Sequence, residues 1–543
     1  MNRPLSVIGS LHVPGRTWYL LVARSRRARL GRALATLLFC ICLVACSTSV
    51  VAPYEPPAPA YALPAQPDSA FAGVEEGLNT QHGADYSGFT LIDRNEEGLR
   101  WRLALIDSAR HSIDFQYYLW YGDAAGKLIA TRLLDAADRG VRVRVLVDDL
   151  NTLLRDASSV VLRDEAVAWL DAHPNIEVRL FNPWSQRDFS GRVGEGLWEL
   201  DRVNRRMHNK ALIADNRAVI LGGRNIGDEY MGLNRSFNFH DLDVLGIGPV
   251  ARQTSAVFDA YWNSRWVMPV AALQIDIPQG ESAAARAEIL HSLSSNPALS
   301  RIPVASRDWT EAIANLRKQL HAGTSRVISD LPEGSTIEHV MLAEIRSLMA
   351  RTQRELLIVN AYIIPTETGI GILRERKAAG AVIRILTNSL ASHDVPAVNS
   401  HYAPWRKPIV ESGAELYELR SDAGIQSGIC DTLPTRSGFV GLHSKAMVVD
   451  REWSYIGSMN FDPRSAALNS EMGVIVRSPG LGEALAKLIE RDMRPANSWQ
   501  VTLDSEGRLR WTHDTKTVRR QPARNAWQRV EEFFFRGIPQ EYY

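Results

Sequence analysis

One 18-residue pattern occurs twice in this chain. The sequence reads HNKALIADNRAVILGGRN from residue 208 and HSKAMVVDREWSYIGSMN from residue 443. Five identities recur at a constant offset of 235 residues: His208 and His443, Lys210 and Lys445, Asp215 and Asp450, Gly222 and Gly457, and Asn225 and Asn460. Five fixed identities arise by chance in roughly one window per several million at average residue usage. The chain therefore contains an internal duplication, and its two halves must share one fold.

The residues before each copy follow the same order of elements. The first half has the apolar run SIDFQYYLW at 112–120, the helical pattern GKLIATRLLDAADRG and the strand VRVRVLVDD at 141–149. The second half has LLIVNAYII at 356–364, then GIGILRERKAAG, then AVIRILTNS at 381–389. Strand, helix and strand in this order form a βαβ unit, which predicts an α/β fold for each half.

These patterns divide the chain into six parts. We expect a signal peptide at 1–45, a proline-rich tether at 46–75, the first half at 76–275, a linker at 276–300, the second half at 301–495, and a carboxy-terminal hairpin with an aromatic tail at 496–543. The alternating stretch WQVTLDSEGRLRW predicts a hairpin that turns at Glu506 and Gly507. The tail AWQRVEEFFFRGIPQEYY has two interpretations: a helix that covers the core, or a contact with the lipid interface.

The amino-terminal segment is typical of an export signal. Residues 1–45 hold seven arginines and no acidic residue, and the 13-residue apolar run at 33–45 is too short to span a bilayer comfortably. The run ends in LVAC, which resembles a bacterial lipoprotein signal with Cys46 as the lipidated residue. An uncleaved anchor and a conventional signal peptide are the alternatives. Six prolines follow between residues 53 and 67 and predict an extended spacer.

The charge and the cysteine content narrow the class of protein further. Without the seven amino-terminal arginines, 55 basic residues face 61 acidic ones, which argues against a general nucleic-acid coat. Only Cys430 follows Cys46, so no disulfide is expected to support the folded body. Together with the export signal and the spacer, this predicts a folded protein tethered outside the cytoplasm, on the inner or the outer membrane of a Gram-negative bacterium.

The repeated residues predict phosphodiester chemistry. In a strand, side chains two residues apart share a face, so each motif histidine points the same way as its lysine. Two ammonium groups neutralise phosphoryl oxygens and the charge that grows in the transition state. One imidazole can attack phosphorus while the other protonates the leaving alkoxide and then activates the acceptor. No H-E-x-x-H or C-x-x-C spacing is present, and no metal site is expected.

The pattern H-x-K-x4-D followed by G-G/S-x-N, present twice, resembles the phospholipase D superfamily over nearly the whole mature chain. The segments FQYYLW, DDLN at 148–151 and the terminal hairpin are most similar to bacterial cardiolipin synthases of the C type. The resemblance implies two tandem α/β/α sandwich halves, related by pseudo-twofold symmetry, with one active site at their interface. It also implies a phosphohistidine intermediate and no metal or other cofactor.

The resemblance implies a role for each repeated residue. His208 is the nucleophile, and His443 is the general acid and later the base. Phosphate binding falls to Lys210, Lys445, Asn225, Ser458 and Asn460, whereas Asp215 and Asp450 hold the local hairpins. Gly223 stands where the second half has Ser458, so a hydroxyl contact to phosphate is expected in one half only.

A carboxylate orients each histidine in this family through the ring nitrogen that does not react. Glu471 in NSEMGVIV lies 28 residues after His443 and is expected to orient His208. The first half aligns Asp241 with Glu471, so Asp241 is expected to orient His443. Asp243 is the alternative, because it lies two residues away in FHDLDVLG.

The motif leaves the substrate open among three reactions. The first transfers a phosphatidyl group to phosphatidylglycerol and makes cardiolipin, with phosphatidylglycerol or phosphatidylethanolamine as donor. The second is hydrolysis to phosphatidic acid, and the third is nucleic-acid cleavage. The resemblance favours transfer, with phospholipids and a membrane surface as partners and no nucleic acid. A non-catalytic lipid-binding scaffold is a further alternative, although all four motif histidines and lysines are present. The donor lipid and the oligomeric state stay open.

Overall fold

The computed structural model describes residues 57–149, 169–184, 199–273, 282–334 and 336–536. The predicted signal peptide, the lipidation site at Cys46 and the first part of the tether lie outside the described residues. None of the helices within those ranges is long and apolar enough to cross a membrane.

The strands of the first half form one mixed sheet. Their spatial order is β9 (Val267–Pro269), β4 (Ile176–Phe181), β3 (Arg142–Asp148), β2 (Ser112–Tyr117), β5 (Ala211–Ala214), β6 (Ala218–Gly222), β8 (Asp243–Ile247) and β1 (Ser87–Ile92). Strands β2, β3 and β4 are parallel to one another, and every other neighbour is antiparallel. The amino end of β5 therefore lies at the carboxyl ends of the parallel strands, where Gln116 pairs with Ala211.

The second half repeats this order. Its strands run β10 (His321–Ser329), β19 (Met472–Arg477), β18 (Trp453–Gly457), β17 (Lys445–Val449), β13 (Glu355–Asn360), β14 (Val382–Asn388), β15 (Glu415–Leu419), β20 (Ser498–Leu503), β21 (Leu509–His513) and β22 (Lys516–Val518). Strands β13, β14 and β15 are parallel, and β17 runs antiparallel to β13. The carboxy-terminal hairpin β20–β21 extends the sheet beyond β15.

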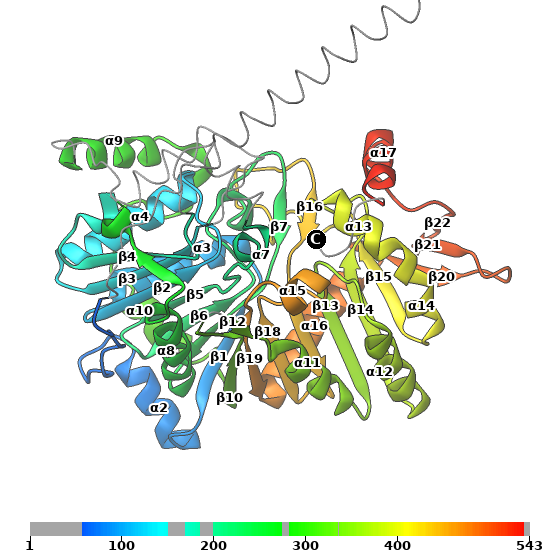
Figure 1. The fold of residues 1–543 in the computed structure, drawn as a ribbon, viewed down its shortest axis with the longest axis horizontal. Coiled ribbons are helices and arrows are strands. Elements are labelled where there is room, and N and C mark those ends of the chain that lie inside the picture. The colour runs from blue at the N-terminus through cyan, green and yellow to red at the C-terminus, as the bar shows by residue number, and fades with distance from the viewer. Residues whose placement is uncertain (1–56, 150–168, 185–198, 274–281, 335, 537–543) are drawn as a thin grey trace, which may run out of the picture. The chain divides into compact units, whose positions relative to one another are not determined.

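The two half-sheets join through β1 and β10, which lie side by side and antiparallel (Figure 1). Because the strand order reverses across this pair, one 18-stranded sheet runs through the body with pseudo-twofold symmetry. A second ladder crosses between the halves, where β7 (Asn238–His240) pairs in parallel with β16 (Val440–Leu442).

Helices cover both faces of the sheet. Helices α3 (Asn95–Ser108) and α4 (Ala124–Asp138) pack on one face of the first half. Helices α11 (Met341–Ala350) and α12 (Glu367–Ala378) pack on the matching face of the second half. The other face buries one continuous core that includes α8 (Pro249–Trp262), α16 (Pro479–Met493) and strands from both halves. Strands buried on both faces are typical of α/β sandwiches.

Thus the predicted α/β fold of two tandem sandwich halves is confirmed. The other described helices and strands are α2 (Ala72–His82), α7 (Leu200–Val203), α9 (Ser282–Ser294), α10 (Thr310–Leu316), β11 (Leu331–Glu333), β12 (Thr336–Glu338), α13 (Pro396–Tyr402), α14 (Arg406–Glu411), α15 (Pro463–Ala467) and α17 (Ala526–Phe535).

The folded body begins earlier in the chain than the predicted boundary at residue 76. The Ala60 backbone N–H donates to Asn263 Oδ1 at 2.9 Å, and the Ala62 backbone N–H donates to Asp259 Oδ2 at 2.9 Å. Phe71 is fully buried in the core of the first half. From Ala60 onward, the predicted tether is therefore bound to the body instead of forming a free spacer. The predicted linker at 276–300 likewise buries Leu293 in that core.

Candidate active site

The two motif histidines stand at equivalent places in the two halves. His208 precedes β5, and His443 precedes β17, so each lies beside the carboxyl ends of the parallel strands of its own half. In open α/β sheets this edge is where ligands bind.

Backbone hydrogen bonds tie each histidine to the opposite half. The His208 backbone N–H donates to the Ser470 carbonyl at 2.8 Å, and the His443 backbone N–H donates to the His240 carbonyl at 2.8 Å. The His240 ring contacts Asp492 of α16 at 2.7 Å. His240 is therefore part of the junction between the halves. The exchange of hydrogen bonds brings both motifs to the interface.

A carboxylate from the opposite half contacts Nδ1 of each imidazole. Glu471 Oε2 lies 2.8 Å from His208 Nδ1, and Asp241 Oδ2 lies 2.5 Å from His443 Nδ1. Both carboxylates are fully buried. A proton held on Nδ1 by this contact leaves Nε2 of the same ring for chemistry on a substrate.

Asp243, the alternative partner for His443, has a different place. Its carboxylate forms ion pairs with Arg102 at 3.0 Å and Arg224 at 3.1 Å, and all three side chains are buried. Of the two candidates, the structure therefore places Asp241 at His443 and uses Asp243 to neutralise two buried guanidinium groups.

Ser458 also differs from its expected place. Its hydroxyl donates to Glu471 Oε2 at 2.5 Å and accepts from the Met472 backbone N–H at 3.0 Å. This side chain therefore holds the carboxylate of Glu471. In the first half a β-carbon on Gly223 would lie 2.1 Å from Asp241 Oδ1. In each half the residue at this position therefore fits the carboxylate next to it: the serine hydrogen-bonds to the glutamate, and the glycine leaves room for the aspartate.

The two motif lysines are buried beside the histidines. Lys210 Nζ donates to the His208 carbonyl at 2.6 Å, and Lys445 Nζ donates to the His443 carbonyl. Burial lowers the pKa of Lys210 well below its ordinary value and lowers the pKa of Lys445 to about 8. Each lysine also lowers the pKa of both histidines. An entering phosphodiester anion would relieve this concentration of positive charge.

The two asparagines of the motifs are buried next to the same edge. Asn225 Oδ1 accepts from the Leu119 backbone N–H at 3.2 Å. Asn460 is 6% exposed, and its Oδ1 has no hydrogen-bond partner among the residues that the structure describes.

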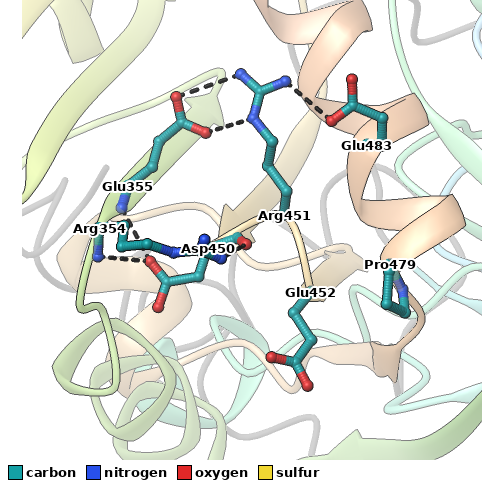
Figure 2. Close-up of a pocket in the computed structure, with 7 residues that line it drawn as sticks. All are labelled: Arg354, Glu355, Asp450, Arg451, Glu452, Pro479 and Glu483. Atoms are coloured by element: carbon teal, nitrogen blue, oxygen red, sulfur yellow. Dashed lines mark hydrogen bonds and ion pairs between the residues drawn. The ribbon is translucent and has the colours of Figure 1, made fainter.

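The motif aspartates lie at the far ends of their strands. Asp215 Oδ1 accepts from the His111 backbone N–H at 2.8 Å, and Asp450 Oδ1 accepts from those of Arg354 and Glu355 at 2.8 and 2.9 Å. Asp450 lines a cavity of about 570 Å³ whose lining residues are mostly charged (Figure 2), separated from His443 by the length of β17. Its carboxylate therefore caps the start of β13 and does not reach the histidines.

Four aromatic rings around the histidines were not singled out in the sequence. The Tyr118 ring packs edge-on against His208 at 4.7 Å between ring centroids. Tyr230, Phe239 and Tyr362 surround His443 at 5.2, 4.9 and 6.5 Å. Tyr118 and Tyr362 are each the third residue from the end of the apolar runs SIDFQYYLW and LLIVNAYII. A tyrosine within two residues of the end of β2 and of β13 was therefore the available signal.

The pKa shifts of the two carboxylates have opposite directions. Burial, Lys210 and Lys445 all lower the pKa of His208, and burial raises the pKa of Glu471 well above its usual range. Both shifts disfavour an ionised pair and keep the His208 imidazole neutral. By contrast, His443 and Lys445 outweigh burial and lower the pKa of Asp241. Burial and Lys445 lower the pKa of His443, and the Asp241 carboxylate opposes that shift without reversing it. A neutral nucleophile at His208 fits these shifts, and His443 is the histidine whose carboxylate favours the protonated form.

Known proteins share this sequence and fold. The family described as "Cardiolipin synthase, PLD-like domain" matches residues 103–262 and 345–493. The chain is 36% identical over 463 residues to cardiolipin synthase C of Escherichia coli strain K12, which covers 83% of this chain and 95% of that relative. It is 25% identical over 420 residues to cardiolipin synthase B of Shigella flexneri, across 75% of this chain and 84% of that one.

Among solved structures, phosphatidylserine synthase of Haemophilus influenzae Rd KW20 is similar, with a TM-score of 0.51 at 16% identity. The match covers 78% of this chain and 89% of that chain. At this identity the likeness shows the shared fold.

Proposed function

Since this chain belongs to the phospholipase D superfamily, in the family of cardiolipin synthase, PLD-like domain proteins, we propose that it makes cardiolipin by phosphatidyl transfer to phosphatidylglycerol. Family membership alone assigns the class of enzyme, a phosphodiester transferase that acts on phospholipids. One observation carries the finer proposal: two imidazoles, each bound to a carboxylate of the other half, lie beside two buried lysines.

The first step forms a phosphohistidine. The lone pair of His208 Nε2 attacks the phosphorus of the donor lipid, and a nitrogen–phosphorus bond replaces the bond to the head-group oxygen. His443 gives its Nε2 proton to that oxygen, which leaves as glycerol or ethanolamine. Lys210 and Lys445 hold the charge that grows on the phosphoryl oxygens.

The second step transfers the phosphatidyl group. His443, now neutral, takes the proton from the glycerol head group of phosphatidylglycerol. The freed oxygen attacks phosphorus, the nitrogen–phosphorus bond breaks, and cardiolipin leaves with His208 restored. The Asp241 carboxylate stabilises the imidazolium of His443 at both stages.

The aromatic rings support transfer over hydrolysis. Tyr230, Phe239 and Tyr362 pack around the base His443 and limit the space in which water could be activated. A glycerol head group delivered by its acyl chains then competes with water at the phosphohistidine.

Mass spectrometry of the lipids tests this proposal directly. The membrane-bound protein is incubated with phosphatidylglycerol, with and without phosphatidylethanolamine, next to a His208→Ala variant and a His82→Ala control. His82 is an exposed histidine remote from the motifs. We expect cardiolipin with the wild type and the control only, and the released alcohol identifies the donor. Phosphatidic acid without cardiolipin would make the enzyme a hydrolase.

We further propose that Cys46 carries the lipid that anchors this enzyme outside the cytoplasm. The LVAC sequence and the prolines after it support this anchor and this location. From Cys46 to Ala60, where the bound segment begins, an extended proline-rich chain reaches about 40 Å. The amino-terminal peptide of the mature protein should begin at a diacylated Cys46. Cys46→Ser should abolish this modification and Cys42→Ser should not; an unmodified amino terminus would reject the anchor.

A further inference from the structure

The carboxy-terminal helix α17 has an inverted pattern of burial. Its apolar side chains point outward: Trp527 and Phe533 are each 65% exposed, and Phe534 is 73% exposed. Gln528 and Glu532 on the same helix are 3% and 2% exposed. The interpretation of this tail as a core-covering helix is therefore wrong for these aromatic side chains.

The buried polar face of α17 is anchored to a defined loop. Gln528 Nε2 donates to the Leu390 carbonyl, and the Gln528 side-chain oxygen accepts from the Arg524 backbone N–H at 3.0 Å. The Arg524 guanidinium donates to the carbonyls of Ala391 and His393 and lies 3.8 Å from the Phe439 ring centroid. The orientation of the helix is thus held by polar contacts, and the aromatic residues stay outside.

That loop leads directly to the active site. His393 stacks on Tyr362 with 5.1 Å between ring centroids, and the Tyr362 hydroxyl donates to Asp394 at 2.8 Å. Tyr362 in turn packs edge-on against His443. In Figure 1, α17 lies next to α13, toward the same end of the view as β7 and β16, the strands beside His443.

The segment that includes α17 has a positive net charge, whereas the chain without its seven amino-terminal arginines has a negative one. Residues 516–536 contain six lysines and arginines but only two glutamates, and Glu532 pairs with Arg536. Arg519, Arg520 and Arg529 are exposed. A helix with aromatic residues on one face and arginines beside them is typical of a segment that lies in the interface of an anionic bilayer.

We infer that α17 is the membrane-docking helix of this enzyme, and that Trp527, Val530, Phe533 and Phe534 enter the head-group region of an anionic phospholipid bilayer. Docking there places the loop 389–394 and the site behind it against the lipid surface. This inference rests on the proposed function, because it assigns the surface through which lipid substrates reach His208 and His443.

The first test compares two physical forms of one substrate. The full-length Trp527→Ala/Phe533→Ala/Phe534→Ala variant should lose about tenfold in rate on phosphatidylglycerol vesicles. It should keep the wild-type rate on short-chain phosphatidylglycerol below its micelle concentration. Tyr61→Ala removes an aromatic side chain of similar exposure, 63%, and should change neither rate. An equal loss on both substrates, or no loss on either, would overturn the inference.

A second test does not depend on turnover. Vesicles of phosphatidylglycerol with brominated acyl chains should quench Trp527, seen as the difference between the wild-type chain and Trp527→Phe. If the chain binds the vesicles and this difference is absent, α17 does not dock. A doubled mass in solution with Trp527 shielded would assign the face to a second copy of the chain instead. Quenching without cardiolipin synthesis would keep the docking helix and reject the proposed reaction.

Discussion

A β-carbon on Gly223 would lie 2.1 Å from Asp241 Oδ1, closer than two such atoms can approach. The glycine therefore makes room for the carboxylate that contacts His443. The equivalent pair in the other half, Ser458 and Glu471, is joined by a 2.5 Å hydrogen bond. Each half thus sets its carboxylate by a different local contact.

Gly223→Ala should displace Asp241 and reduce kcat by about 100-fold, because the His443 imidazolium loses its counter-charge. Overpacking at this buried position should also cost about 1–3 kcal/mol in the free energy of unfolding, measured by denaturant titration. Ser458→Ala removes only one hydrogen bond to Glu471 and should have a smaller effect on kcat. A wild-type kcat in Gly223→Ala would show that Asp241 need not hold this position.

The two histidines should be separable with a donor that needs no acid. On phosphatidyl-p-nitrophenol, His443→Ala should release a burst of p-nitrophenol equal to the enzyme present and then stall, since p-nitrophenolate leaves without a proton. His208→Ala should give no burst. Rapid-mixing absorbance records the burst, and the reverse pattern would exchange the two roles.

Anion binding should take up protons in mildly alkaline solution. Burial lowers the pKa of Lys445 to about 8, and a bound anion favours the ammonium form and raises that pKa again. Affinity for tungstate, a phosphate mimic, should therefore fall as the pH rises above 8, by up to about tenfold per unit for one proton.

Titration calorimetry at pH 8.5 in two buffers of different ionisation enthalpy measures this uptake. Lys445→Arg should take up about one proton fewer, because arginine stays charged. An unchanged proton count in this variant would contradict the assignment to Lys445.

Substitution of Asp241 should mainly reduce kcat, whereas substitution of Asp243 should mainly reduce stability. Asp241→Asn should reduce kcat by about 100-fold or more with little loss of stability, because it removes the charge beside His443. Asp243→Asn should destabilise the protein by about 3–5 kcal/mol, because Arg102 and Arg224 stay buried without their counter-charge. Measurements of kcat and of denaturant unfolding on both variants test these two roles. Equal losses of kcat in the two variants would contradict them.

The site could be outlined from the sequence because its chemistry is duplicated. Aligning the two copies identified Glu471 and Asp241 as the expected orienting carboxylates, and both lie within 3 Å of a histidine. Asp243 could not be excluded in this way, because side chains two residues apart in a strand share a face and an alignment cannot tell which partner each meets. The ion pairs that occupy Asp243 depend on Arg102, which lies more than a hundred residues away in the chain.

Other features depend on distances that no pattern records. Whether the Ser458 hydroxyl meets a phosphate or Glu471 is decided by the spacing of β18 and β19. The rings around His443 come from three separate segments and converge only in the folded chain.

The sequence by itself determined that two equivalent α/β halves exist and that two histidines and two lysines belong to one kind of chemistry, since fixed spacing and strand periodicity are local properties. Only the tertiary structure decided between Asp241 and Asp243 as the partner of His443, and which face of α17 is exposed. Helical periodicity places Trp527, Val530 and Phe534 on one face, but it does not say whether that face or Gln528 and Glu532 will meet the body. The physical reason is that packing and charge pairing join residues hundreds of positions apart.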